Sequence, residues 1–149
     1  ETGIEIQHLE IFNISGRQIQ ITILWPKQND YLKHDLSDNN KSLVTLIEYS
    51  DQKILICSDI EQFAQKELLK LYPDLKADIV VIPHHGSSNT LDPDFLGSLN
   101  AEILICSTDK TPAIENSGQL FYTSRDGAIN VSIDKYGKTK VETYIKKND

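Results

Sequence analysis

Short apolar runs separated by polar turns predict a chain built largely from β-strands. Residues 5–12 and 18–25 are two such runs, and the small and polar residues at 15–17 between them favour a β-hairpin. Residues 27–42 are polar, charged and rich in Asn and Asp, which is typical of an exposed loop. A further strand is expected at 43–49. The N-terminal third is therefore expected to be antiparallel.

The middle of the chain is organised around residues 79–82, Ile-Val-Val-Ile, which are followed by Pro83. Four β-branched residues in a row indicate a strand buried on both faces, as in a parallel sheet. Runs of the same kind lie at 54–57 and 101–106, and each closes with Ile-Leu-Ile-Cys. Because helical connections are expected between these runs, we predict that strands 54–57, 79–82 and 103–106 are adjacent and parallel in one sheet.

Two helices are expected to make these connections. The first spans 60–71 and packs on the face of the sheet, and Ser58 and Glu61 before it fit a capping box with Ser58 as the N-cap. The second has Asp92 as its N-cap and Pro93 as its first residue. The expected buried faces are Ile60, Phe63, Ala64, Leu68 and Leu71 in the first helix and Phe95, Leu96 and Leu99 in the second.

Three more strands are expected near the C-terminus, at 119–123, 128–133 and 140–145. Gly residues within the pairs 126–127 and 136–137 predict turns between them. The whole pattern predicts an α/β fold with a mixed sheet and a central parallel β-α-β-α-β segment. At 149 residues, the chain is long enough to be a single domain, 1–149, with its own core.

Composition narrows the possible functions. Apolar content of 39% and charged content of 25% are ordinary for a soluble globular protein, and no apolar run is long enough to cross a membrane. The net charge of −7, from 15 basic and 22 acidic residues, argues against a broad basic surface that would bind nucleic acid through this chain alone. Binding of an anion would need a local site, such as a metal ion.

The two cysteines, Cys57 and Cys106, are expected to be free core thiols. They end two strands that should be separated by a third, and neighbouring strands lie about 4.8 Å apart. The two thiols would then be too far apart for a disulfide.

Candidate chemistry follows two of the three buried strands. Asp59 comes directly after the first, and His84 and His85 follow the second. Because the carboxyl ends of neighbouring parallel strands meet at one edge of a sheet, Asp59 and one histidine could reach a common point. A carboxylate and an imidazole suit a divalent metal such as zinc or manganese. The alternative is purely structural: a surface turn that contains two histidines, and an acidic residue favoured at a helix N-terminus.

Several segments resemble the second half of the metallo-β-lactamase-like domain found at the C-terminus of ComEC-type competence proteins. The resemblance covers roughly residues 17–133. It rests on four segments in the same order, with support from IQITILWP (19–26): NNKSLVTLIEY (39–49), KILICSDIE (53–61), LKADIVVIPHHGS (75–87) and TSRDGAI (123–129).

The resemblance implies an αβ/βα sandwich with a pair of metal ions at one edge of its sheets, of which this chain would be the second half. Asp59 matches the aspartate that bridges the metals, and the His84–His85 pair matches a later histidine ligand. We favour His85 as the ligand, with His84 beside the ligands or facing the phosphate. Asp59 and His84 are thus the expected catalytic residues, and Asp59 and His85 the expected metal ligands.

The same resemblance implies a role in DNA uptake. The domain in ComEC-type proteins is similar to metal-dependent phosphodiesterases and is thought to degrade one strand of incoming DNA. The implied partners are DNA and the remainder of a parent protein with a membrane channel. The implied location is the extracytoplasmic face of a bacterial membrane, and this chain, which begins at Glu1 without Met, is expected to be a soluble piece of that protein.

Three departures from the family pattern leave other functions open. The H-x-H-x-D-H motif of the first half is absent, with His8 and His34 isolated; Ser58 stands where the family usually has Gly; and residues 107–118 replace a Tyr-Gly-His-Pro loop and its helix. A non-catalytic domain that positions DNA or a partner is the second hypothesis, and an unrelated hydrolase using Asp59 and His85 alone is the third. An open catalytic zinc site needs about three protein ligands. We therefore expect no tightly bound pair of metals and no DNA cleavage from the isolated chain.

Overall fold

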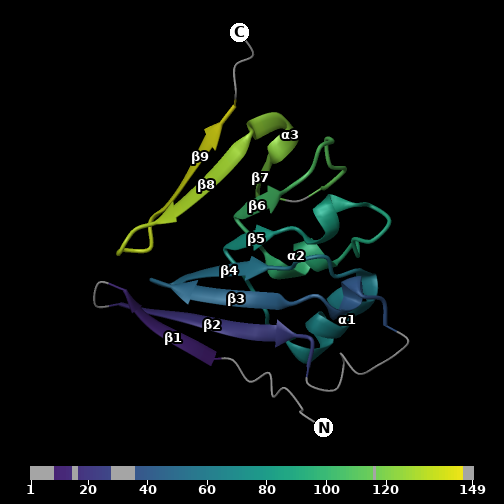
Figure 1. The fold of residues 1–149 in the computed structure, drawn as a ribbon, viewed down its shortest axis with the longest axis horizontal. Coiled ribbons are helices and arrows are strands. Elements are labelled where there is room, and N and C mark those ends of the chain that lie inside the picture. The colour runs from purple at the N-terminus through teal and green to yellow at the C-terminus, as the bar shows by residue number, and fades with distance from the viewer. Residues whose placement is uncertain (1–8, 15–16, 28–35, 116, 146–149) are drawn as a thin grey trace.

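The computed structural model describes residues 9–14, 17–27, 36–115 and 117–145 of the chain. These residues form a seven-stranded sheet, a separate two-stranded hairpin, and short helices (Figure 1). The strands are β1 (Leu9–Ile14), β2 (Arg17–Trp25), β3 (Val44–Tyr49), β4 (Gln52–Ile56), β5 (Ile79–Val81), β6 (Ile103–Cys106), β7 (Gln119–Tyr122), β8 (Ala128–Ile133) and β9 (Thr139–Tyr144). The helices are α1 (Gln62–Leu71), α2 (Phe95–Leu99) and α3 (Thr123–Asp126), with 3₁₀ turns η1 (Asn39–Lys41) and η2 (Pro83–Gly86).

The strand order in the large sheet follows the chain from β1 to β7. Strands β1 to β4 pair antiparallel, and β4 to β7 pair parallel. Helix α1 connects β4 to β5, and α2 connects β5 to β6. The prediction of a mixed sheet with adjacent, parallel strands β4, β5 and β6 is therefore confirmed.

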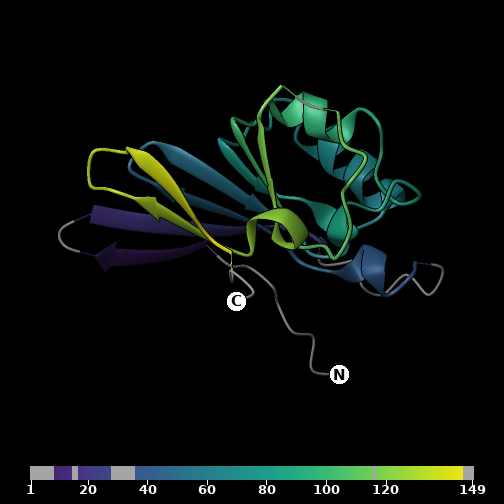
Figure 2. The same cartoon turned by 90° about the horizontal axis from the view of Figure 1, so that it is seen from above.

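One face of this sheet is covered by the two helices. Leu55, Val80 and Leu104 are partners in register across β4, β5 and β6, and all three are fully buried. Figure 2 shows α1 and α2 on the same side of these strands. The helices bury Ala64, Gln65 and Leu68 from α1 and Phe95, Leu96 and Leu99 from α2. The predicted packing of the first helix on the sheet is confirmed, although Phe63 and Leu71 are exposed.

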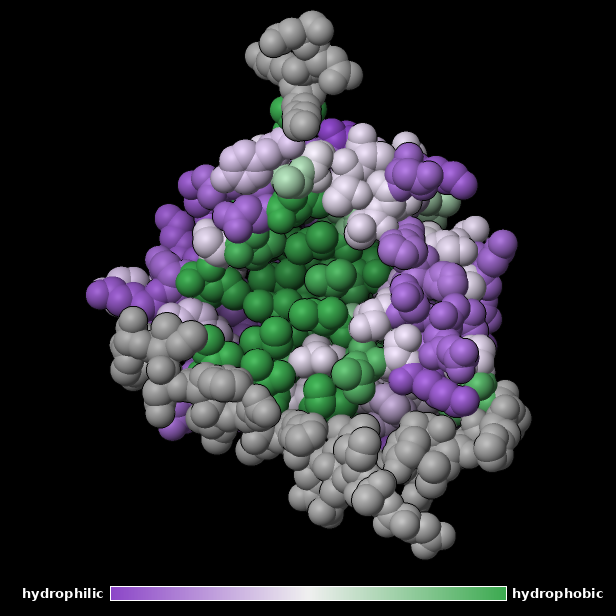
Figure 3. Space-filling model, in the orientation of Figure 1, coloured by the Kyte–Doolittle hydropathy of each residue, from purple (hydrophilic) through white to green (hydrophobic). Residues whose placement is uncertain are grey.

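The opposite face carries apolar side chains, and no helix of the described residues lies over them. Because side chains alternate along a strand, the neighbours of the buried residues point to this other side. We call it the open face, defined by the partly exposed residues Ile54, Ile56, Val81, Ile103 and Ile105. Figure 3 shows a continuous hydrophobic area in the middle of the molecule on the side away from the helices.

The β8–β9 hairpin is joined to the large sheet at both of its ends. It follows directly from α3 beside β7, and its turn reaches the β3–β4 turn, where Thr139 Oγ1 donates to Gln52 Oε1 at 3.0 Å. Burial alternates along β8, with Ile129, Val131 and Ile133 partly buried and the residues between them exposed. The predicted strands are confirmed, with β9 starting one residue earlier than expected.

The predicted capping box is wrong. Ser58 has φ of +49°, and α1 begins only at Gln62, with Glu61 in the N-cap position and no side-chain cap from Glu61 itself. The cap comes from a distant loop: Asn40 Oδ1 accepts hydrogen bonds from the backbone N–H groups of Glu61 and Ala64 at 3.1 and 3.2 Å. A short-range sequence pattern carries no information about such a partner.

Other boundaries differ in smaller ways. Helix α2 begins at Phe95 with Asp94 before it, although Asp92 Oδ1 accepts from the Asp94 N–H at 3.1 Å, as an N-cap would. The expected turn at 126–127 is preceded by one helical turn, α3, and Gly127 has φ of +70°. The N-terminal hairpin is confirmed within the described residues, where β1 spans 9–14 and so extends two residues beyond the predicted end at 12.

Some expectations concern thiols, membrane spans and undescribed residues. Cys57 and Cys106 are free and fully buried, as predicted. Within the described ranges, no helix is both long enough and apolar enough to cross a membrane. His8, His34 and the first residues of the expected 5–12 strand lie outside the described residues.

Candidate functional site

The carboxyl ends of β4, β5 and β6 meet at one edge of the sheet, and the residues that follow them form the candidate site. The ladder extends slightly beyond the strands, because the N–H of Cys57 donates to the Val81 carbonyl and that of Ile82 to the Ile105 carbonyl. Farther out, the N–H of His84 donates to the Ser58 carbonyl at 3.0 Å. These bonds fix the loop after β4 against the loop after β5.

Asp59 and His85 face each other across this junction. Nε2 of His85 lies 3.9 Å from Oδ1 of Asp59, and the two side chains are 68% and 53% exposed. This separation is shorter than the sum of two metal–ligand bonds of about 2.1 Å each, so both atoms can reach one ion. The convergence expected from the sequence is therefore present in the structure.

Hydrogen bonding determines which nitrogen of His85 is available. Nδ1 lies 2.7 Å from the carbonyl oxygen of Ser107, which follows β6. Because a carbonyl only accepts hydrogen bonds, Nδ1 must carry the proton. In the neutral ring, Nε2 then has the free lone pair and faces Asp59. A ligand histidine whose other nitrogen donates to a backbone carbonyl is the usual arrangement at metal sites.

His84 has a different environment from its neighbour. Its side chain is partly buried, and among the described residues its Nδ1 is a buried nitrogen with no hydrogen-bond partner. A buried polar atom without a partner is costly, so such atoms call for an explanation in a native fold. The two adjacent histidines are therefore not equivalent: one presents a nitrogen beside a carboxylate, and the other holds a nitrogen in the interior.

The backbone of this turn is strained. His84, His85 and Gly86 have successive φ angles of +47°, +54° and +70°. Only glycine adopts this region without a steric cost, and each of the other residues pays about 1–2 kcal/mol. At Gly86 there is also no room for a side chain, since a Cβ would lie 2.8 Å from the Cys106 sulfur. Strained residues of this kind cluster at functional sites, where the surrounding structure holds them in place.

The buried cysteines behind the turn do not extend the set of metal ligands. Burial in the apolar core raises the pKa of Cys57 strongly and raises that of Cys106 as well. Both thiols are therefore protonated near neutral pH, whereas metal binding uses the thiolate. Within the described part of the chain, no group of three or more His, Cys, Asp or Glu side chains is placed to hold a metal ion.

Two shallow hollows adjoin the Asp59–His85 pair. One is lined by His85 together with Ser107, Thr108, Asp109, Thr123 and Ser124. The other lies beside it, along the turn at 84–88 and the loop at 108–113. Thr123 closes the first hollow, because its hydroxyl accepts from the Thr108 N–H and donates to the Thr108 carbonyl, both at 2.8 Å.

Sequence reasoning missed this second side of the site. The sequence predicts only a polar connection at 107–118, which contains Ser107 and Thr108, and a strand at 119–123, which ends at Thr123 and leaves Ser124 unassigned. The signal that was available is the segment TSRDGAI at 123–129, which the family resemblance singled out without giving its role.

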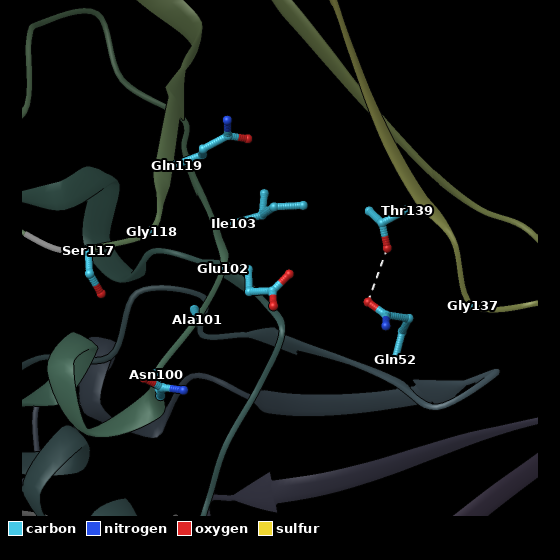
Figure 4. A pocket seen from close by; sticks show the side chains of 10 residues that line it. All are labelled: Gln52, Asn100, Ala101, Glu102, Ile103, Ser117, Gly118, Gln119, Gly137 and Thr139. Carbon is cyan, nitrogen blue, oxygen red and sulfur yellow. Dashed lines mark hydrogen bonds between the residues drawn. The ribbon is translucent and has the colours of Figure 1, made fainter.

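A further hollow lies at the opposite edge of the sheet, between the amino ends of β6 and β7 and the β8–β9 hairpin (Figure 4). Its lining includes Gln52, Glu102, Gln119 and Thr139, and Figure 4 shows the Gln52–Thr139 hydrogen bond on one side. Glu102 is the one ionisable side chain among its lining residues. This hollow therefore offers less chemistry than the edge with Asp59 and His85.

Comparison with known proteins gives two distant relatives. The chain is 27% identical to ComE operon protein 3 of Bacillus subtilis (strain 168) over 111 residues, which are 74% of this chain and 14% of that protein. It is 28% identical to the uncharacterized protein YcaI of Escherichia coli (strain K12) over 87 residues, which are 58% of this chain and 11% of that protein. No family model matches the chain. The chain thus corresponds to a small part of each of these much longer proteins.

Proposed function

We propose that this chain is part of a ComEC-type DNA-uptake protein and contributes Asp59 and His85 to the metal site of a phosphodiesterase domain. The observation that carries the proposal is the geometry of these two groups. In the neutral ring, the hydrogen bond from Nδ1 to the Ser107 carbonyl leaves the lone pair on His85 Nε2, which lies 3.9 Å from Asp59 Oδ1. The similarity to ComE operon protein 3 supports a role in competence and DNA uptake.

The two side chains fit a divalent cation such as zinc or manganese as a partial site. A carboxylate oxygen and a neutral imidazole nitrogen are common ligands of both metals. When bound, such a cation polarises a phosphoryl oxygen and activates water for hydrolysis. Asp59 and His85 would hold the cation, and His84 would support them or face the phosphate. The remaining ligands would come from another part of the parent protein.

The open face supports a fold that continues beyond this chain. Sheets normally bury an apolar face against another layer, and a large exposed patch marks an interaction surface. We propose that the open face packs against the first half of a metallo-β-lactamase-like sandwich, which the parent protein supplies. Residues 1–149 would then form the second half of that single domain.

The proposal also includes the binding partners of this chain and its location in the cell. DNA would reach the site through the parent protein, which would include a membrane channel, and the domain would lie on the extracytoplasmic face of a bacterial membrane. A cation held by Asp59 and His85 would allow an acidic domain to bind a phosphate, because the charge of the ion dominates the local field.

The test compares the isolated chain with a longer piece of the parent protein that includes the segment preceding it. After dialysis against zinc and manganese, the isolated chain should retain fewer than two equivalents of metal. The longer piece should cleave single-stranded DNA in the presence of Mn²⁺. Asp59→Asn and His85→Gln should each lower this rate by about 100-fold or more, since even supporting groups at metal sites contribute 10–100-fold.

The exposed Asp74 offers a matched control, and Asp74→Asn should leave the cleavage rate unchanged. Two equivalents of metal retained by the isolated chain, or full cleavage by the Asp59→Asn variant, would show that the site is built differently.

A non-catalytic domain that positions DNA or a partner is the second candidate. It is favoured by Ser58, which has a φ of +49° at the position where the family usually has Gly. Under this alternative, the longer piece would bind single-stranded DNA without cleaving it, and Asp59→Asn would not change the affinity.

A further inference from the structure

The loop that carries Asp59 is held at both of its ends. On the side of β4, the Ser58 carbonyl accepts a hydrogen bond from the N–H of His84 at 3.0 Å. On the side of α1, Asn40 Oδ1 accepts from the N–H groups of Glu61 and Ala64 at 3.1 and 3.2 Å. Asp59 lies between these two fixed points.

Asn40 is itself fixed on every side. It is 7% exposed, and its Nδ2 donates to Glu61 Oε2 and to Ser37 Oγ, both at 3.0 Å. Its backbone carbonyl accepts from Trp25 Nε1 at 2.7 Å, and Trp25 is buried at 1% exposure. A side chain with both ends of its amide bonded in a buried position has one orientation, so the cap on α1 is rigid.

This cap affects which groups the Asp59 carboxylate can bond to. The first N–H groups of a helix lack partners within the helix, and a nearby carboxylate is one of the groups that can satisfy them. Asp59 lies two residues before Glu61, the N-cap of α1, and could turn toward those donors if they were free. Asn40 occupies two of these donors, and the Asp59 carboxylate is 53% exposed and lies beside His85.

We propose that Asn40 is the positioning residue for Asp59: it caps α1 from a distant loop, and thereby keeps the Asp59 carboxylate directed at His85. This inference deepens the proposed function and rests on it insofar as the Asp59–His85 pair binds a metal. Glu61 supports the same cap. Its carboxylate accepts hydrogen bonds from the side chains of Ser37, Asn39 and Asn40, and this holds the Asn40 amide in place.

The test uses Asn40→Ala in the full 149-residue chain, with Asn130→Ala as the control. Asn130 is an exposed residue of β8 that donates to Glu142 Oε2 at 3.4 Å and takes no part in the cap on α1. The first readout is the broadening by MnCl₂ of the NMR signals of the His85 ring. Asn40→Ala should weaken the apparent Mn²⁺ affinity about tenfold or more, as for other residues that support metal ligands, and Asn130→Ala should change it less than threefold.

The second readout needs no metal. Amide hydrogen exchange of His84, which donates to the Ser58 carbonyl, reports whether the loop keeps its position. In Asn40→Ala, the exchange rate of the His84 amide should increase relative to the unmodified chain. The factor of this increase should be at least ten times the factor for the Val80 amide in the core of β5. A role in stability alone would raise both rates by the same factor, and that outcome would overturn the proposal.

A rescue variant completes the design. Asn40→Asp combined with Glu61→Gln exchanges donor and acceptor between the two side chains while keeping an oxygen to cap α1. It should restore the slow His84 exchange and the Mn²⁺ affinity to within threefold of the unmodified chain. If the unmodified chain shows no broadening at His85, the proposed metal function fails, and the exchange data alone decide whether Asn40 positions the loop.

Discussion

At the scale of single residues, the site contains backbone conformations that few residues other than glycine adopt. Ser58, His84 and His85 all have positive φ angles, and the N–H of His84 bonds to the Ser58 carbonyl. The two loops thus hold each other in strained conformations. Among the described residues, three of the six non-glycine residues with a positive φ therefore lie where the candidate ligands project.

Ser58 gives a direct test of this strain. Ser58→Gly should stabilise the chain by about 0.5–1 kcal/mol, because relief of the left-handed conformation exceeds the extra entropy of glycine in the unfolded chain. Ser58→Ala should be nearly neutral, since Ser58 is not the N-cap of α1. Urea denaturation of both variants measures these changes, and a loss of about 1 kcal/mol in Ser58→Ala would restore Ser58 as a cap.

The sequence predicted the position of the candidate ligands but not what orients them. Asp59 and His85 could be placed because each directly follows a run of β-branched or aliphatic residues. The Ser107 carbonyl that fixes the His85 tautomer is a backbone atom, and no side-chain pattern marks it. Asn40 and Gln65 also escaped prediction, because polar residues that bond across the fold look like ordinary loop or helix-surface residues.

At the scale of elements, the strands were predictable and the short helices were not. Runs such as Ile79 to Val81 have one interpretation, because burial on both faces removes the alternation of polar residues. Helix α3 has four residues, too few for any helical periodicity, and Gly127 after it indicated only a turn. The start of α1 was misplaced because its cap lies 21 residues away in the chain.

Strand β6 allows the two faces of the sheet to be compared within adjacent residues. Leu104 is fully buried under the helices, and Ile105 lies on the open face. In the isolated chain, Leu104→Ala should cost about 2–5 kcal/mol, as for other fully buried leucines, and Ile105→Ala clearly less. Urea denaturation at neutral pH compares the two. Equal losses would mean that the open face is already packed against something in solution.

At the scale of the whole molecule, stability should depend on carboxylates in the C-terminal part. Hydrogen bonds from Arg125, and a further one from the Tyr122 N–H at 2.8 Å, lower the pKa of Asp126 below its usual value. Backbone hydrogen bonds lower the pKa of Asp134, and Lys140 lowers that of Glu142. These groups stabilise the fold at neutral pH because their charged forms are favoured in the native state.

Because these pKa values are lowered on folding, the fold should lose stability in acid. An aspartate whose pKa is lowered on folding contributes fully above its unfolded pKa of about 3.9, and that contribution is lost as the pH falls through the lower native value. The melting temperature should therefore fall below about pH 5, and the fall should be shallower in Asp126→Asn. Thermal unfolding followed by circular dichroism from pH 7 to pH 2 measures this, with Asp74→Asn as the control. Identical slopes in Asp126→Asn and the unmodified chain would contradict it.

The arrangement of the C-terminal hairpin was beyond sequence reasoning. Its two strands were predicted, but the hydrogen bond between Thr139 and Gln52 joins residues that are 87 positions apart. Nothing local to either residue indicates the other. Among the residues that the structure describes, the helices cover one side of the large sheet, and the open face on the other side carries no helix.

The agreement between strand order and chain order has a consequence for synthesis. Each strand of the large sheet lies next to the strand made just before it, from β1 to β7. No strand has to insert between two others that have already paired, and each pairing closes only the chain between consecutive strands, which favours it kinetically over a pairing between more distant strands. The sheet can therefore grow in step with the ribosome, and β8 and β9, which follow β7 in the chain, then close against the β3–β4 turn.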